Sequence, residues 1–201
     1  MTADELHAAV TALLDRSDLA AHVPLWHRLA RGEMNTVLRH PDMETYAVLA
    51  LVEGQAELPA DCLDVLNVEA EGASGGRLCF RHRNAFDGAR TRATSPQAGA
   101  GYTIQGRFLL TYPSLGESPL EIRYLGALGV PEGSGTDWLL TRHPNADLYG
   151  TAMHGYMHTM EGERATMCRR EFMRALDDVT RQGVDLSTGP NPVTEPSTAV
   201  I

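Results

Sequence analysis

The segment from Thr136 to Gly150, which reads TDWLLTRHPNADLYG, constrains the fold most because it fixes a break between two helices. Thr136 is the expected N-cap of a short helical turn. Pro144 disfavours helix at His143 and suits the first turn of a following helix, so we expect the chain to break and restart at His143/Pro144. The short turn is expected to place three side chains in the structural core: Trp138, Leu139 and Leu140.

Two helices in tandem are predicted after this break. Apolar residues share one broad helical face after Pro144, and a second apolar stripe with spacings of three and four follows Gly162. The first set is Leu148, Met153, Tyr156, Met157 and Met160, and the second is Ala165, Met167, Cys168, Phe172, Leu176 and Val179. Leu148 and Phe172 join the expected core. An antiparallel pair that ends at a glycine C-cap, Gly183, is the simplest arrangement.

The N-terminal third predicts two further helices. Thr2 and Glu5 match a capping box, which indicates a helix that ends near Asp15 to Asp18. Pro24 suits the first turn of the next helix. The apolar residues assigned to these helices are Leu6, Val10, Leu13, Leu14, Trp26, Leu29, Ala30, Val37 and Leu38. Both helices need a partner surface that buries these stripes.

Between residues 43 and 135 the pattern changes to short runs of strand-forming residues separated by glycine or proline. The predicted strands cover residues 45–52, 62–69, 77–82, 102–104, 108–112 and 120–125. Gln105-Gly106 is the expected turn of a hairpin. The predicted fold is α+β: a helical bundle built from the N- and C-terminal helices, with an inserted small antiparallel β-region and an extended C-terminal tail.

The domain organisation follows from this alternation. Residues 1–42 and 136–183 are expected to form the helical body, 43–135 the β-rich insert, and 184–201 the extended tail, whose proline-rich composition cannot form a core alone. The loop 84–101 has no periodicity, which indicates a segment that is mobile or ordered only by a partner.

Composition excludes several classes of protein. At 201 residues and 43% apolar content, the chain can form a real core and is not disordered. Its net charge of -9, with arginine as the cationic residue throughout, argues against a general nucleic-acid binder but not against a wall that DNA slides past. No apolar run reaches the roughly 18 residues of a membrane span, and the start lacks a signal-peptide pattern, so we expect synthesis in the cytosol.

Catalytic and metal-binding patterns are weak. Cys62, Cys79 and Cys168 show no metal-type spacing and are interpreted as small apolar fillers. His154 and His158 stand four residues apart, as in a helical zinc site, but the zincin glutamate is missing, which favours packed or surface histidines. The sequence therefore predicts no enzyme, catalytic residue, metal or cofactor.

Several phrases occur in an order that resembles the head-to-tail adaptor, or neck, proteins of tailed phages. The resemblance spans roughly residues 5 to 183 and is most specific in the Trp-Leu-Leu to Leu-Tyr-Gly segment. The chain departs from the family pattern at 127–131 and in the middle loop. The phrases are RSDL at 16–19, LR at 38–39, LPAD at 58–61, YTIQG at 102–106, LEIRY at 120–124 and DWLLTRHP at 137–144.

The resemblance implies a non-enzymatic ring component of about twelve copies in the virion neck, beneath the portal protein and above tail nozzle or tail tube proteins. DNA would pass through without specific binding, and no membrane is involved. The loop 84–101 and the tail 184–201 are then expected to be contact segments, and whether the tail docks on the portal or on a neighbouring subunit stays open.

Two alternatives follow from other readings of the same residues. A tail-completion or terminator protein would also form a ring but would bind the tail tube alone. A cell-wall hydrolase would need a catalytic cluster, for which His154, His158 and Glu161 are the available residues.

Overall fold

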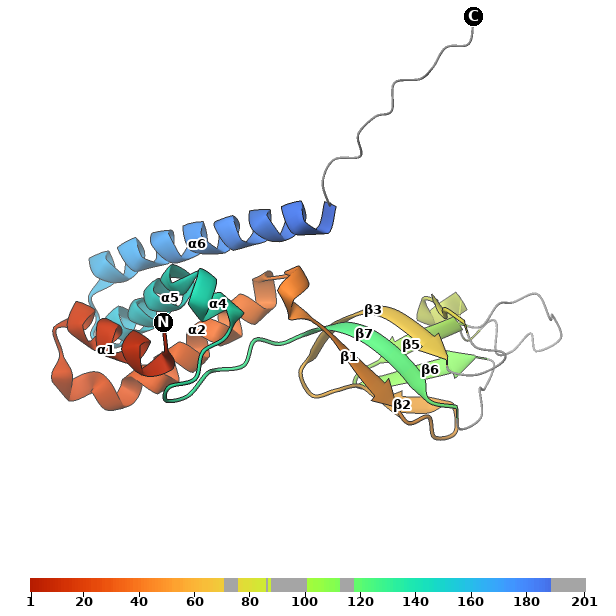
Figure 1. The fold of residues 1–201 in the computed structure, drawn as a ribbon. Coiled ribbons are helices and arrows are strands. Elements are labelled where there is room, and N and C mark those ends of the chain that lie inside the picture. Colours follow the sequence, from red (N-terminus) through yellow and green to blue (C-terminus); the bar gives the residue numbers. More distant parts are fainter. Residues whose placement is uncertain (71–75, 86, 88–100, 113–117, 189–201) are drawn as a thin grey trace, which may run out of the picture. The chain divides into compact units, whose positions relative to one another are not determined.

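A computed structural model describes residues 1–70, 76–85, 87, 101–112 and 118–188 of the chain (Figure 1). The chain divides into two units, which we call the helical unit (Met1–Asp42 with residues from Leu128 onward) and the β unit (Met43–Ala127). The expected α+β fold is confirmed, because N- and C-terminal helices pack together and a region of small β-sheets is inserted between them.

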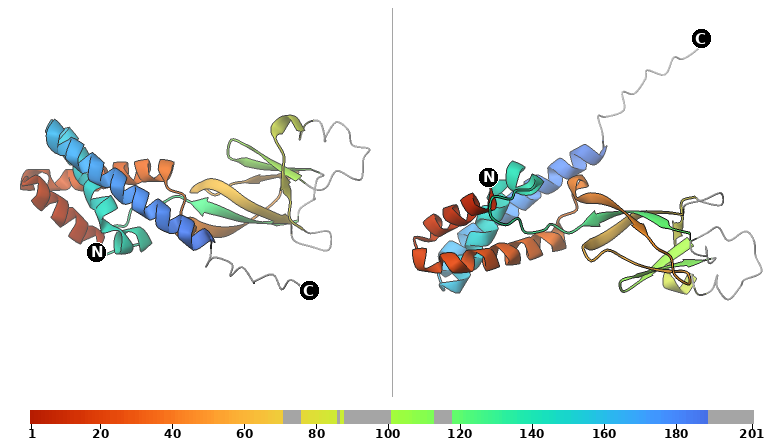
Figure 2. Two further views of the ribbon diagram at one scale, coloured as in Figure 1. Left: turned by 90° about the horizontal axis from the view of Figure 1, so that it is seen from above. Right: turned by 60° about the horizontal axis from the view of Figure 1, so that its bottom comes forward.

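In the helical unit, α5 lies between α6 on one side and the α1–α2 pair on the other (Figures 1 and 2). Its elements are α1 (Ala3–Leu14), η1 (Ser17–His22), α2 (Val23–Val37), η2 (Pro41–Met43, which reaches into the β unit), α4 (Trp138–Arg142), α5 (Pro144–His158) and α6 (Gly162–Thr188). The predicted break at His143/Pro144 is confirmed, since α4 ends at Arg142 and Pro144 opens α5, with only His143 between them.

Capping side chains define two of the helix starts. The predicted capping box is present: the Thr2 hydroxyl accepts from the Glu5 amide at 3.2 Å, and the Glu5 carboxylate accepts from the Thr2 amide at 2.9 Å. The expected cap at Thr136 is wrong. Asp137 is the N-cap of α4, and its carboxylate accepts from the Leu140 amide at 2.8 Å, because it stands immediately before the first helical residue.

The helical core contains most of the predicted stripe, but several predicted residues are exposed. Leu6, Val10, Trp26, Ala30, Met153, Tyr156, Phe172 and Leu176 are buried, whereas Leu13, Leu29, Val37, Met157, Met160 and Met167 are exposed. Met160 follows the end of α5 with a φ of 61°, so it cannot continue the buried face.

Helix α6 is longer than expected. The predicted end at Gly183 is wrong, since α6 continues to Thr188 and residues 184–188 are helical rather than extended. Gly183 serves close packing instead: a Cβ at this position would lie 2.7 Å from Cδ2 of His40. The rest of the expected tail, 189–201, lies outside the described residues, as does most of the loop 84–101.

Residues 128–135, which the sequence pattern placed with the insert, hydrogen-bond to the helical unit. The Leu128 amide donates to the Asn35 side chain at 2.7 Å, and the carbonyls of Gly133 and Gly135 accept from the first amides of α1 at 2.9 and 3.0 Å. Because those amides have no partner inside the helix, the returning chain satisfies them.

In the β unit, two small sheets enclose one apolar core. The first has the order β1-β7-β3 and the second β2-β6-β5-β4. The described strands are β1 (Glu44–Leu49), β2 (Gln55–Glu57), β3 (Cys62–Ala70), β4 (Cys79–Phe80), β5 (Gly101–Gln105), β6 (Phe108–Tyr112) and β7 (Leu120–Gly126). Side chains from both sheets form the core, among them Val68, Leu109, Leu120 and Ile122, and Leu51 from the connection between β1 and β2 joins them.

The predicted strand pattern is confirmed, with two differences in the observed sheets. The hairpin is confirmed, with β5 paired to β6 and Gly106 in the turn at a φ of +61°. Strand β2 was missed because its three residues, two of them polar, show no apolar alternation. The pair β4–β5 is parallel rather than antiparallel, which the long connection between Phe80 and Gly101 permits.

Gly150→Ala is expected to destabilise the protein, because the added Cβ would meet Phe172 Cε2 at 2.9 Å and Ala30 Cβ at 3.1 Å. Overpacking of this kind costs about 1–3 kcal/mol. Urea unfolding followed by circular dichroism measures the loss. The matched control is Gly32→Ala in α2, where the new methyl meets open space and should raise stability by about 0.5–1 kcal/mol. Equal effects of the two variants would contradict this packing.

Candidate functional site

The residues predicted for the structural core occupy two environments. Leu139, Leu140 and Phe172 are buried, whereas Trp138 and Leu148 are half-buried. The Trp138 ring stacks on His40 at a centroid distance of 4.6 Å. Leu139 and Leu140 therefore anchor the returning chain in the helical unit. The half-buried Trp138 ring covers His40.

His154 and His158 have separate neighbours. The His154 Nε2 atom lies 3.2 Å from a Glu33 carboxylate oxygen, whereas the His158 ring contacts Trp26 and His22 at centroid distances of 5.6 and 5.5 Å. Within the described part of the chain, no three His, Cys, Asp or Glu side chains form a group that could hold a metal ion.

The three cysteines are free thiols, but they are not all fillers. Cys168 is buried and Cys62 half-buried, and burial raises the pKa of both thiols. Cys79 is exposed, so its interpretation as a packed filler is wrong. The reason is that β4 is a two-residue strand at the edge of its sheet, where both of its residues are exposed.

A buried charge network lies where α2 meets α4 and α5. Arg31 is 1% exposed and donates two hydrogen bonds to Asp147, from Nε to Oδ1 at 2.6 Å and from Nη2 to Oδ2 at 2.7 Å. Its Nη1 atom donates to Asp137 at 2.5 Å and to the Gly129 carbonyl at 3.2 Å. Burial alone would lower the pKa of Arg31, but the two carboxylates outweigh it and raise that pKa.

Two histidines extend this network toward the surface. His27, which is fully buried, lies 3.1 Å from Asp147 Oδ1, and its other ring nitrogen lies 3.3 Å from His7 Nε2. Burial and the neighbouring His27 lower the pKa of His7, and Asp4 partly opposes that shift. The arrangement ties α2 to α4 and α5 and, through His7, to α1.

Residue spacing does not reveal this network, although the sequence contains one usable signal. His27 and Arg31 lie on the buried face of α2 together with Trp26, Ala30 and Met34. Polar residues at positions of an apolar stripe indicate buried polar partners. The partners themselves, Asp137 and Asp147, are more than a hundred residues away, so spacing cannot identify them.

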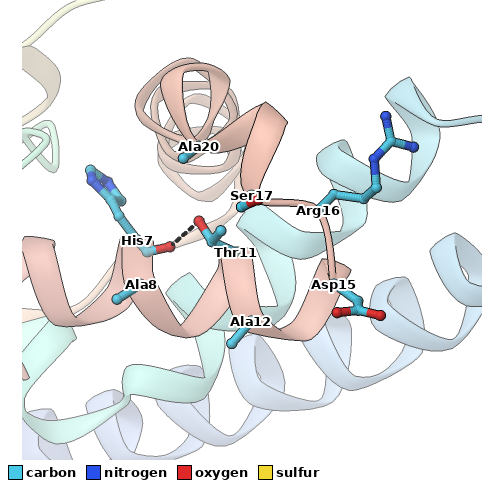
Figure 3. A pocket seen from close by; sticks show the side chains of 8 residues that line it. All are labelled: His7, Ala8, Thr11, Ala12, Asp15, Arg16, Ser17 and Ala20. Atoms are coloured by element: carbon cyan, nitrogen blue, oxygen red, sulfur yellow. Dashed lines mark hydrogen bonds between the residues drawn. The ribbon is translucent and has the colours of Figure 1, made fainter.

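The hollow next to His7 is wide and open, with a volume of about 560 Å³. Figure 3 shows its lining of mostly small side chains from α1 and η1. The Thr11 hydroxyl donates to the His7 carbonyl at 2.8 Å, and Arg16 pairs with Asp18 at 2.8 Å. These polar groups are therefore engaged with the chain itself, which does not favour a substrate site.

A second hollow, which we call the α1–α6 groove, has a volume of about 350 Å³. Its lining comes from three helices and consists of Leu13, Tyr149, Tyr156, Arg164, Met167, Cys168 and Glu171. The Tyr156 hydroxyl donates to the Leu13 carbonyl at 2.7 Å and ties α5 to α1. The groove is thus mainly apolar, with one cation and one anion among its lining residues.

Large apolar side chains are also exposed elsewhere on the helical unit. On α2, Leu25 is 52% exposed and Leu29 47%, and they stand one helical turn apart. Met157, Met160 and Met167 are exposed around the junction of α5 and α6. Apolar groups gathered on a surface are typical of protein contact sites.

Comparison with protein-family models matches residues 1–194 to the family described as SU10 adaptor protein. The chain belongs to the SU10 adaptor protein family. This is a phage head-to-tail adaptor family, so the resemblance seen in the sequence is confirmed. In the comparison with curated proteins, none matches the chain.

The match extends over the described parts of both units, so neither unit is an addition foreign to the family. Adaptors bind other virion proteins, which agrees with the exposed apolar side chains of the helical unit. Across the described residues of this adaptor, no helix is both long and apolar enough to cross a membrane.

Arg31→Met is expected to destabilise the adaptor by about 3–5 kcal/mol, because it leaves the Asp147 carboxylate buried without its guanidinium partner. Replacing both residues, Arg31→Met with Asp147→Leu, should recover part of the loss, since the carboxylate that remains, Asp137, is partly exposed. Chemical denaturation measures all variants against Arg16→Ala, which removes an exposed pair and should change little. An Arg31→Met variant as stable as Arg16→Ala would show that the network does not hold the helices.

The adaptor is expected to lose stability in mild acid. Burial lowers the pKa of His7, His40, His143 and His154 below the ordinary value of 6.5. The unfolded chain therefore binds more protons than the folded one, and the stability present above pH 6.5 is lost as pH falls through the folded pKa values. Unfolding free energies between pH 8 and 5 should show this decline.

His154→Gln should make the decline with pH shallower, because it removes one half-buried imidazole whose pKa burial lowers. His82→Gln, which changes an exposed histidine, is the control and should leave the slope unchanged. A flat pH profile of the unmodified protein would be inconsistent with neutral histidines in the folded state.

Proposed function

We propose that the chain is a structural, non-enzymatic virion protein that forms a ring, of twelve copies, between the portal and the tail and lines the DNA exit channel. The observation that carries this proposal is the family match over residues 1–194. The exposed apolar side chains of the helical unit support it, because a ring subunit needs such surfaces toward its neighbours.

The partners in this proposal are further copies of the chain, the portal protein, and tail nozzle or tail tube proteins. The protein is made in the host cytoplasm and acts in the virion neck, where the genome leaves the particle during ejection. DNA passes without specific binding, and the net charge of -9 favours this because a phosphate backbone is not attracted to an acidic protein.

Two segments are assigned to contacts: the loop 84–101 and the residues that follow α6. The second of these combines prolines with an apolar run, a composition that suits docking on another chain rather than independent folding. Single contacts of this kind are weak, and many copies around a ring supply avidity. The free adaptor is therefore expected to be mainly monomeric and to close into a ring on the portal.

Mixing the purified adaptor with assembled portal should produce a ring, whereas the adaptor alone should stay monomeric. Light scattering measures the free state, and averaged electron micrographs measure the order of the ring. A stable closed dodecamer without the portal would contradict the order of assembly. The tail tube protein is the matched second partner: a ring that forms on it and ignores the portal would favour a terminator protein instead.

A further inference from the structure

We propose that the α1–α6 groove of one adaptor receives residues 195–201 of a second copy. In this contact, Glu195 lies beside Arg164 and the apolar run Ala199–Ile201 covers the apolar side chains of the groove. The inference rests on the proposed function in one respect, namely that copies of the chain assemble with one another.

The groove offers an apolar surface that the described chain leaves open. Leu13 is 42% exposed and Met167 65%, and both line the groove together with Tyr149 and Tyr156. Its volume of about 350 Å³ lies near the lower end of ligand pockets, roughly 300–1,000 Å³. A few side chains of an extended segment fit this space, whereas a folded domain does not.

The sequence after α6 has the matching chemistry. Residues 189–201 contain one charged residue, Glu195, followed by Pro196 and then by the apolar run Ala199–Val200–Ile201. Two more prolines, Pro190 and Pro192, precede them. Proline favours the extended polyproline II conformation, so less entropy is lost when such a segment docks.

Charge gives the docked segment its direction. Arg164 lies over the Tyr156 ring at 5.7 Å and pairs with Glu161 at 3.0 Å, which holds the guanidinium at the groove while 59% of the side chain stays exposed. Glu171 also lines the groove, seven residues further along α6, and would repel a second carboxylate. An acidic residue is therefore favoured beside Arg164, which directs Glu195 to that end.

Distance excludes Glu195 of the same chain as the partner of Arg164. Between Arg164 and Thr188, helix α6 rises about 36 Å at ~1.5 Å per residue. Even at full extension, the seven residues from Thr188 to Glu195 span at most about 25 Å at ~3.6 Å per residue. Because Arg164 also points back toward Glu161, a residue nearer the start of α6, Glu195 of the same chain cannot reach it. A second copy has no such restriction.

The experiment uses the full-length chain with ¹³C-labelled methionine methyl groups and a peptide of residues 189–201 that is amidated at its end. Titration should shift the Met167 resonance with saturation and leave Met173, which is exposed on the same helix outside the groove, unchanged. A Val200→Asp peptide and a Glu195→Arg peptide should each bind about tenfold more weakly or worse. Arg164→Glu in the protein should restore binding of the Glu195→Arg peptide. An equal shift of Met173, or no shift of Met167, overturns the inference.

Two unlabelled variants test whether the occupant comes from a second copy. Met167→Glu damages the groove and keeps the segment, whereas Val200→Asp damages the segment and keeps the groove. At a concentration where neither variant associates alone, their mixture should sediment as a heterodimer, because one intact contact remains. As the control, Met173→Glu replaces Met167→Glu. This variant keeps both the groove and the segment, so it should associate as the unmodified chain does. The inference fails if no heterodimer forms and Val200→Asp changes the Met167 resonance equally at every protein concentration. That result would show that the segment docks on its own chain.

The same variants separate this inference from the proposed function. If the peptide does not bind the groove but the adaptor still forms a ring on the portal, the groove contact is wrong and the adaptor function stands. If the peptide binds the groove but no ring forms on the portal, the groove contact stands and the proposed function is wrong.

Discussion

Arg31 sets the geometry of the helical unit, because one buried guanidinium holds carboxylates from two other places in the chain. Asp147 lies inside α5, and Asp137 caps α4, so the same side chain of α2 fixes both elements of the segment that returns from the β unit. A buried charge is tolerated only when its donors are satisfied, which requires α2, α4 and α5 to meet in one arrangement. The close approach of α5 to its neighbours at Gly150 then follows.

This geometry explains how an insertion can interrupt the helical unit without weakening it. The chain leaves that unit at Asp42 and returns at Leu128, whose backbone bonds to Asn35 of α2. The β unit has its own core between two small sheets. Since each unit has buried apolar side chains of its own, each can present its own surface to other virion proteins.

The function depends on surfaces that the core leaves open. The helical unit buries one face of α1, α2 and α6 against α5, yet it keeps Leu25, Leu29 and Met167 exposed. The polar cluster around Arg31 is buried, and its side chains bond to one another and to the Gly129 carbonyl. Apolar exposure combined with a satisfied interior is what a component that assembles with other chains needs.

Local chemistry made much of the fold predictable: the capping box at Thr2, the break at Pro144 and the hairpin at Gly106 each depend on a few adjacent residues. The family was also recognisable, since the sequence contains short motifs in the order that is typical of the adaptor family. The partners of Arg31, the packing of Gly183 on His40 and the exposure of Met167 were not predictable. The sequence by itself determined most helices and strands to within a few residues, although not β2. Only the tertiary structure decided which of the predicted apolar side chains are covered, because that depends on contacts between residues far apart in the chain.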